Sequence, residues 1–179
     1  MIRRGAWRGS MLMVGCWLSV AGSAWAGGDH TMPAKPGSPA FERMKQLAGT
    51  WTGTTTMEGK AEPASIEYRT TSGGTAVIET LFSGTPHEMV SVYHDEAGQL
   101  AMTHYCVMGN QPKLRLTNAA DGRMDFSLAE GSGIDAAHES HMHALTLTWT
   151  DADHLTQAWT SYENGKANET TTINVARSH

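Results

Sequence analysis

The sequence predicts an all-β protein, an antiparallel up-and-down β-barrel of about ten strands with a short N-terminal plug helix. After Gly49, apolar and polar residues alternate with period two, which is typical of strands that face a core on one side. Short turn sequences interrupt the alternation, among them Gly73-Gly74, Asp121-Gly122 and Asn164-Gly165. Turns this short join antiparallel neighbours. A closed barrel leaves no exposed sheet edge, so we favour it over a two-sheet sandwich.

The first 26 residues have the pattern of a secretory signal peptide. A basic start with three arginines precedes an apolar stretch from Met11 to about Val20, and Ala24-Trp25-Ala26 is a small-x-small cleavage site. We therefore expect cleavage after Ala26 and a periplasmic or secreted protein. A retained membrane anchor and a lipoprotein cleaved at Cys16 are the alternatives, although the apolar stretch is shorter than the ~20 residues of a spanning helix.

Removal of residues 1–26 leaves 153 residues with 10 Lys or Arg and 18 Asp or Glu, a net charge of −8. The basic residues do not cluster, which argues against nucleic acid or an anionic membrane as a partner. No later segment is apolar enough to span a membrane. Cys106 is then the one remaining cysteine, so no internal disulfide is expected. The oligomeric state stays open.

The start of the folded domain is marked by a helix signal. Residues 27–37 are rich in Gly and Pro and are expected to form a disordered leader, and residues 38–179 the barrel. Ser38-Pro39 is an N-cap followed by proline at the first helical position. Gly49 should end this helix of about ten residues. Its apolar face comprises Phe41, Met44, Leu47 and Ala48.

Ten alternating stretches follow the helix. We expect strands at residues 50–57, 64–71, 74–83, 87–94, 100–107, 113–118, 123–129, 142–150, 154–162 and 169–175. In residues 142–150, for example, Leu145, Leu147 and Trp149 alternate with threonines. The apolar set should face inward and the threonines should face solvent.

A short motif lies where the expected helix meets the first strand. Leu47-Ala48-Gly49-Thr50-Trp51-Thr52-Gly53 resembles the opening of the calycin superfamily, which includes lipocalin-like, fatty-acid-binding-like and nitrobindin-like barrels. The resemblance implies that Trp51 closes the barrel floor, that a ligand site lies inside, and that the chain is similar to secreted bacterial lipocalin-like proteins of unknown function. Typical secreted lipocalins have disulfides and a late helix, which this sequence lacks. Nitrobindin-like proteins bind haem through a barrel histidine, and no histidine here matches that ligand by motif.

The alternation fails at residues 87–94 and 100–106, where both faces mix apolar and ionisable residues. Such failures tend to mark functional sites. With a four-residue loop at Asp95–Gly98, His94 pairs with Gln99, Met89 lies opposite His104, and His87 lies opposite Cys106. One face then carries His87, Met89, Ser91, Tyr93, Met102, His104 and Cys106.

This face has several interpretations. Imidazole, thioether and thiolate are ligands for a soft metal such as copper. Methionine and a lone cysteine are also ordinary core residues, which is the interpretation we favour. A nucleophilic pair of Cys106 and His104 is a further alternative. In each case the residues form a polar patch in an apolar wall, which a small-ligand pocket needs.

Three histidines, His138, His141 and His143, lie at the start of the strand expected at residues 142–150. They are candidate ligands for zinc or copper. The alternative is a solvated loop in which His143 alone points inward beside Leu145.

Three further residues are candidates for a ligand site. Glu79 lies in a nearly continuous apolar strand and would need Arg115 or a histidine as partner if buried. If the adjacent Ile78 faces inward, the alternation of the strand favours an outward side chain for Glu79. Asn110 lies in a turn at the barrel rim, where it contacts either a ligand or solvent, and Trp159 is a core residue that could line the cavity.

We therefore predict an exported binding protein for a small, largely apolar ligand held inside the barrel. The first alternative is a metal- or haem-binding barrel that uses His87, His104, Cys106 or His143. The second is an enzyme of unassigned reaction that acts through His104 with Glu79 or Tyr105. The sequence has no phosphate-binding loop and no Ser-His-Asp signature, which argues against the enzyme alternative, and no cofactor is identified.

Overall fold

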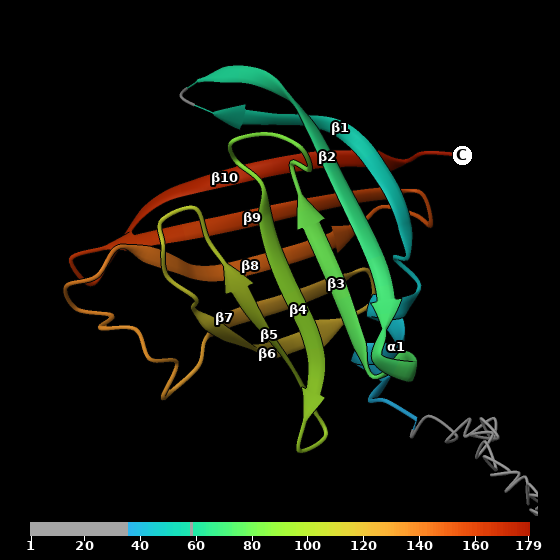
Figure 1. Ribbon diagram of the computed structural model, residues 1–179, viewed down its shortest axis with the longest axis horizontal. Helices are drawn as coiled ribbons and strands as arrows, with labels where there is room; N and C mark the ends of the chain where they lie inside the picture. The colour runs from blue at the N-terminus through green and yellow to red at the C-terminus, as the bar shows by residue number, and fades with distance from the viewer. Residues whose placement is uncertain (1–35, 58) are drawn as a thin grey trace, which may run out of the picture. The chain divides into compact units, whose positions relative to one another are not determined.

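The computed structural model describes residues 36–57 and 59–179. The expected signal peptide at residues 1–26, and residues 27–35 of the expected leader, lie outside the described residues. The described chain is all-β, with a short helix followed by ten antiparallel strands that close into a barrel (Figure 1). The prediction of fold class is confirmed.

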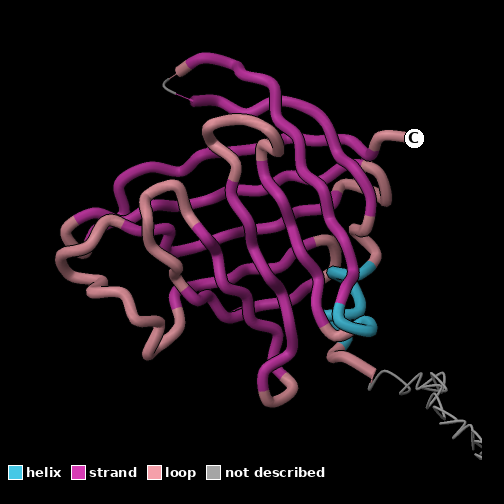
Figure 2. Tube along the Cα trace, viewed as in Figure 1, coloured by secondary structure: helices cyan, strands magenta, loops and turns pink. Residues whose placement is uncertain are grey.

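Each strand pairs with its neighbours in the chain, and the first strand pairs with the last. The elements are α1 (Pro39–Lys45), β1 (Gly49–Met57), β2 (Lys60–Thr71), η1 (Ser72–Gly74), β3 (Ala76–Leu81), β4 (Met89–Glu96), β5 (Gln99–Tyr105), β6 (Lys113–Ala120), β7 (Arg123–Leu128), β8 (His141–Trp149), β9 (His154–Glu163) and β10 (Lys166–Arg177). The longest connection between strands runs from β7 to β8 (Figure 2).

Helix α1 begins as predicted and ends earlier than predicted. The Ser38 hydroxyl accepts a hydrogen bond from the Phe41 backbone N–H at 3.2 Å, and Pro39 occupies the first turn. After Lys45 the chain tightens into i→i+3 hydrogen bonds, which replace the expected continuation to Gly49. The side chains of Phe41 and Met44 are buried, so α1 covers one end of the barrel.

Trp51 forms the floor of the barrel at that end. Its indole is fully buried, and Nε1 donates to the Leu47 carbonyl at 2.8 Å. The Arg177 guanidinium lies 4.2 Å from the Trp51 ring centroid and donates to the carbonyls of Gln46 and Ala48. One arginine of the last strand therefore satisfies the end of the helix and covers the first strand.

The interior between the two ends is filled by side chains. Among the largest fully buried residues are Trp51, Tyr68, Tyr93 and Phe126, which come from four different strands. Tyr93 and Phe126 meet edge to face with ring centroids 5.9 Å apart. Most of the barrel interior is thus a packed core.

The β4–β5 hairpin has a tighter turn than predicted. Glu96 pairs with Gln99, which leaves a two-residue turn in which Ala97 and Gly98 have φ of 54° and 84°. Two consecutive positive φ values define a turn whose twist suits a hairpin. The predicted pairing of Met89 with His104 is therefore wrong, and Ser91 faces His104 instead. Because the register differs by two residues, each side chain keeps its predicted face.

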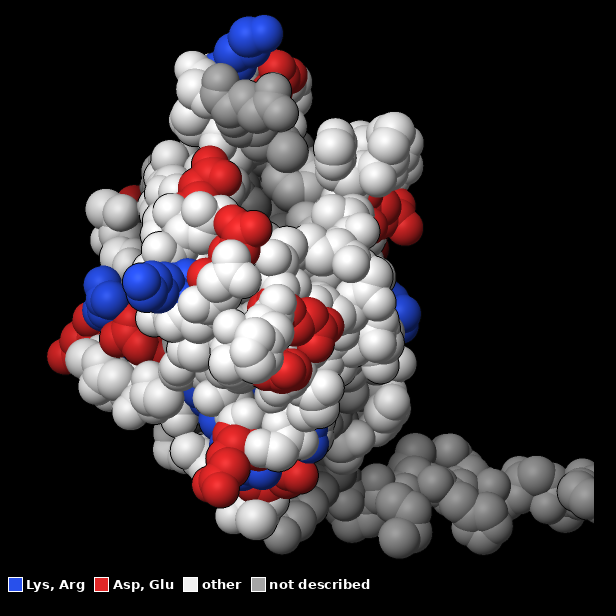
Figure 3. Space-filling view, turned by 90° about the vertical axis from the view of Figure 1, so that its left-hand side faces the viewer, with Lys and Arg blue, Asp and Glu red and all other residues white. Residues whose placement is uncertain are grey.

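Charges on the barrel surface are dispersed. On the face shown in Figure 3, acidic and basic side chains are interspersed with uncharged ones, without a continuous basic area. Within residues 36–57 and 59–179, the helices are too short and too polar to cross a membrane.

Gly53 of β1 lies close to the backbone of β10. A Cβ atom at this position would lie 2.0 Å from the Asn174 carbonyl oxygen. We expect Gly53→Ala to lower the free energy of unfolding by about 3 kcal/mol, because backbone atoms of both strands must move apart. Urea denaturation measures the change, and Thr54→Ala on the exposed face of β1 serves as the control. Equal stability of the two variants would contradict this close approach.

Candidate functional site

A buried carboxyl group lies at the centre of the barrel. Glu79 of β3 is fully buried together with Val77 and Leu81, so the predicted outward orientation is wrong. The strand is apolar on both faces, and Phe82 has a left-handed φ of 54° that ends the strand. Phe82 is therefore buried beside Leu81, and its burial does not indicate which face of β3 carries Glu79.

Glu79 is satisfied by neutral hydrogen-bond donors. The Tyr68 hydroxyl donates to Oε1 at 2.7 Å, the Tyr93 hydroxyl donates to Oε2 at 3.2 Å, and Gln157 Nε2 also donates to Oε1. The predicted partner Arg115 instead pairs with Glu96 at 2.7 Å on a half-exposed part of the barrel. The carboxyl group is thus held by hydrogen bonds from three strands.

Burial dominates the protonation of this cluster. It raises the pKa of Glu79, although hydrogen bonds from Tyr68, Ser91, Gln157 and Tyr93 act to lower it. Burial, together with the negative charge of Glu79, also raises the pKa of both tyrosines well above the ordinary value. The tyrosines therefore remain neutral donors at physiological pH.

A row of four polar side chains crosses neighbouring strands. Tyr68 of β2 pairs in register with Glu79, Glu79 with Ser91 of β4, and Ser91 with His104 of β5. The Ser91 hydroxyl lies 3.0 Å from His104 Nδ1. The row connects the carboxyl group to the imidazole through one hydroxyl.

His104 ends this row with a free nitrogen. Its side chain is 1% exposed, and Nε2 has no hydrogen-bond partner among the described residues. Burial lowers the pKa of His104 to about 4, so the ring is neutral at pH 7. The ring centroid lies 4.5 Å from that of Trp159, whose Nε1 donates to Gln157 Oε1 at 2.7 Å. The indole is therefore fixed beside the imidazole.

A cavity of about 130 Å³ lies beside His104 and Trp159. Met89 and Met142 reach it from the first residues of β4 and β8, whereas α1 lies near the last residues of the same strands, so the cavity is at the opposite end from α1. Its lining is mainly apolar and comprises Leu81, Phe82, His87, Met89, His104, Val107, Met142, Trp159, Thr171 and Ile173.

The structure brings several predicted site residues together here. His87, Met89, His104 and Trp159 line the cavity, and Glu79 and Tyr93 lie in the polar cluster connected to it. Cys106 is buried next to Met89, with Sγ 4.0 Å from Sδ, and burial raises the pKa of its thiol. Tyr105 is half exposed and lies on the other face of β5, so it does not meet His104.

The three histidines near β8 do not converge on a metal site. A bulge between Met142 and Ala144 breaks the alternation, so Met142 lines the cavity and the predicted inward orientation of His143 is wrong. His143 stacks on Tyr162 at 3.7 Å, and its Nδ1 lies 3.1 Å from Nε2 of the buried His141. His138 is exposed and contacts Asp135. In the described ranges, no three His, Cys, Asp or Glu side chains form a group suited to a metal ion.

Asn110 connects the β5–β6 loop to the β7–β8 loop through hydrogen bonds and does not line the cavity. Its Nδ2 donates to Glu139 Oε1 and to the Ser140 carbonyl, both at 2.8 Å. Sequence reasoning missed Gln157, which connects Trp159, Tyr68 and Glu79. A glutamine on the same face as Leu155 and Trp159 was the available signal.

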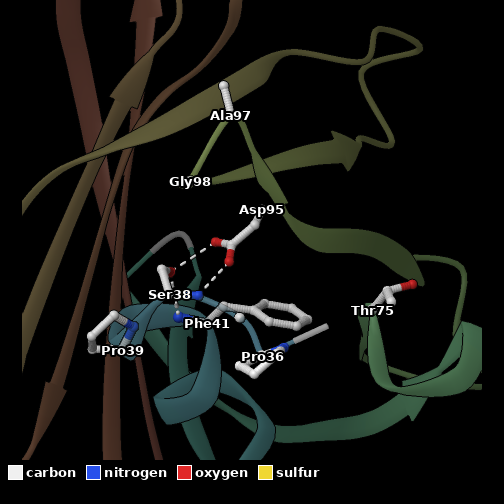
Figure 4. A pocket seen from close by; sticks show the side chains of 9 residues that line it. Pro36, Ser38, Pro39, Phe41, Thr75, Asp95, Ala97 and Gly98 are labelled. Atoms are coloured by element: carbon white, nitrogen blue, oxygen red, sulfur yellow. Dashed lines mark hydrogen bonds between the residues drawn. The ribbon is translucent and has the colours of Figure 1, made fainter. Parts of the chain in front are cut away.

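A larger hollow lies at the other end of the barrel. It is an open groove of about 620 Å³ beside the N-terminus of α1, lined by Pro36 and the β4–β5 turn (Figure 4). The Asp95 carboxylate points into it and accepts hydrogen bonds from the Ser38 backbone N–H and hydroxyl (Figure 4). Because this carboxylate is already engaged by the helix N-terminus, we place the candidate site at the cavity beside His104.

Fold and site together define a closed ten-stranded antiparallel barrel with a small apolar cavity at one end. Two solved structures are similar: a protein of unknown function of the DUF3598 family from Nostoc punctiforme, with a TM-score of 0.52 and 13% identity over 75% of this chain, and Rv2717c from M. tuberculosis, with a TM-score of 0.51 and 12% identity over 80% of this chain. This chain spans 49% of the Nostoc protein and 100% of Rv2717c. No protein-family profile and no curated protein matches the sequence. At these identities the similarity shows the fold alone.

Replacement of Glu79 tests the central cluster. Glu79→Leu removes the acceptor of three buried hydrogen bonds, and we expect a loss of about 3 kcal/mol or more in the free energy of unfolding. Glu79→Gln keeps one acceptor oxygen and should lose about 1 kcal/mol.

The stability that Glu79 provides should depend on pH. Because the pKa of Glu79 is raised in the folded state, its contribution to the free energy of unfolding is complete below pH 4.5 and is lost as pH rises. Denaturation at pH 5 and pH 8 should therefore show a smaller difference between wild type and Glu79→Gln at pH 8; a larger one would contradict this assignment.

His104 should make stability depend on pH in the opposite direction. Its pKa falls from 6.5 to about 4 on folding, so its contribution is complete above pH 6.5 and is lost as pH falls to 4. The pKa shift corresponds to a contribution of about 3 kcal/mol to the free energy of unfolding. We expect His104→Phe to lose less stability than wild type between pH 7 and pH 4 in urea melts, and exposed His138→Gln to behave as wild type. Parallel pH profiles for wild type and His104→Phe would refute the buried neutral ring.

Proposed function

We propose that this protein binds a small, largely apolar, neutral molecule in the cavity beside His104, with one polar group of the ligand bonded to His104 Nε2. The observation that carries the proposal is a buried imidazole nitrogen that has no partner among residues 36–57 and 59–179 and lies in the wall of a cavity whose lining is mainly apolar. An unpaired buried polar atom costs about 1–3 kcal/mol, and a ligand that bonds to it removes this cost. Apolar walls with a few placed polar groups are typical of small-molecule sites.

The size of the cavity limits the ligand. A volume of about 130 Å³ is close to that of an engineered cavity of about 150 Å³ that binds benzene. The enclosed part therefore suits one small ring or the apolar end of a longer molecule. Val107, which is 53% exposed, lies on the rim and offers apolar surface to a part of the ligand that extends outward.

We further propose a calycin-like barrel that is exported after cleavage behind Ala26. The basic, apolar and small-x-small segments of the first 26 residues support export. The position of Trp51 at the floor, directly after the helix and its turn, supports the calycin-like assignment. The two similar barrels are compatible with it at the level of fold.

Phenol and toluene are suitable probes, because they share a ring and differ in one hydroxyl group. We expect both to shift the NMR signals of cavity residues, including the indole N–H of Trp159. Phenol can bond to His104 Nε2 and toluene cannot, so His104→Phe should lower the ratio of phenol to toluene affinity about 5- to 10-fold. Ile173→Phe fills the cavity and should weaken both probes, whereas His138→Gln should weaken neither.

Two results would overturn the proposed function. One is the absence of shifts at cavity residues with both probes at millimolar concentration. The other is binding that Ile173→Phe leaves unchanged, because the probes would then occupy a different part of the surface.

A further inference from the structure

Two sulfur atoms meet at the rim of the cavity. Cys106 Sγ lies 4.0 Å from Met89 Sδ, although the residues are 17 positions apart in the chain. Met89 is the first residue of β4 and lines the cavity, and Cys106 directly follows β5 and is 8% exposed. The β4–β5 hairpin brings the thioether and the thiol together.

A nitrogen ligand is available beside this pair. His104 precedes Cys106 by two residues, which corresponds to about 6.6 Å along an extended chain. It is 1% exposed, lines the same cavity as Met89, and has a free Nε2 among the described residues. Met142 reaches the same cavity from β8 and brings a second thioether. Two thioethers and the His104 imidazole thus line one small cavity, and the Cys106 thiol lies against one of the thioethers.

We propose that Met89, Cys106 and His104 form a binding site for a soft monovalent metal ion, Cu(I) or its analogue Ag(I). Thiolate and thioether ligands select Cu(I) over hard cations, and imidazole also suits copper. The Sγ–Sδ distance of 4.0 Å is short enough for one ion to bind both sulfur atoms with bonds of about 2.3 Å, the length of a zinc–sulfur bond.

The surroundings favour a soft ion over a hard one. The described residues that line the cavity include no carboxylate, and Mg²⁺ and Ca²⁺ require oxygen ligands. When the ion binds, the S–H bond of Cys106 breaks, a sulfur–metal bond forms, and the proton passes to water. The oxidation state of the metal does not change. The site shares His104 with the proposed organic ligand and does not depend on that ligand.

Silver titration of the full chain tests this site. The background variant carries Cys16→Ser, so that Cys106 is the one remaining cysteine. In chloride-free buffer, native mass spectrometry should show one Ag(I) per chain. Against a competing chelator, Cys106→Ser should lower the affinity at least 100-fold, and Met89→Leu and His104→Phe about tenfold each. Met124→Leu, a buried methionine near α1, is the matched control and should leave the affinity unchanged.

Thermal melts of each variant establish that it is folded before its affinity is compared. Affinity that Cys106→Ser or Met89→Leu leaves unchanged would overturn the proposal. Loss of binding in His143→Gln would also overturn it, because the ion would then lie at the His141–His143 pair. A chain that binds phenol and no Ag(I) refutes the metal site alone, and a chain that binds Ag(I) and neither phenol nor toluene refutes the organic-ligand site alone.

Discussion

A buried carboxyl group without a cationic partner is the constraint on which the interior depends. Such a group is tolerated only when its oxygens accept hydrogen bonds. For Glu79 these come from Tyr68 on β2, Tyr93 on β4 and Gln157 on β9, so one side chain connects neighbouring strands with a strand across the barrel. A slip of one residue in any of these strands would remove a donor from the interior. The cluster therefore specifies the strand register as well as filling space.

The same cluster shapes the cavity. Gln157 accepts from the Trp159 indole and thereby fixes its ring beside His104, while Ser91 engages His104 Nδ1. These bonds leave His104 Nε2 without a hydrogen-bond partner in the part of the chain that the structure describes. Because the barrel is packed from the floor up to this level, the free nitrogen is presented only at the end opposite α1. Fixed partners behind the imidazole give the site a defined orientation.

The sequence predicts those features that depend on local pattern. Alternation and turn residues predicted all ten strands, because each of them buries at least part of one face. Local pattern fails where local rules are ambiguous. The β3 strand is apolar on both faces, so the alternation did not determine the orientation of Glu79. An alanine such as Ala97 rarely adopts a positive φ, so the two-residue turn was not predicted. The bulge at His143 has no signal in the sequence. Gln157 lies 78 residues from its partner Glu79, and no spacing rule connects them.

The electrostatics of the cavity restrict what can occupy it. With a pKa of about 4, His104 is neutral at pH 7, and the lining contains no Lys or Arg. An anionic ligand such as a carboxylate would thus enter without a countercharge, which is costly in an apolar site. A neutral molecule avoids that cost. A monovalent ion bound to one thiolate is likewise a neutral pair, so the same physical limit applies to both proposed occupants.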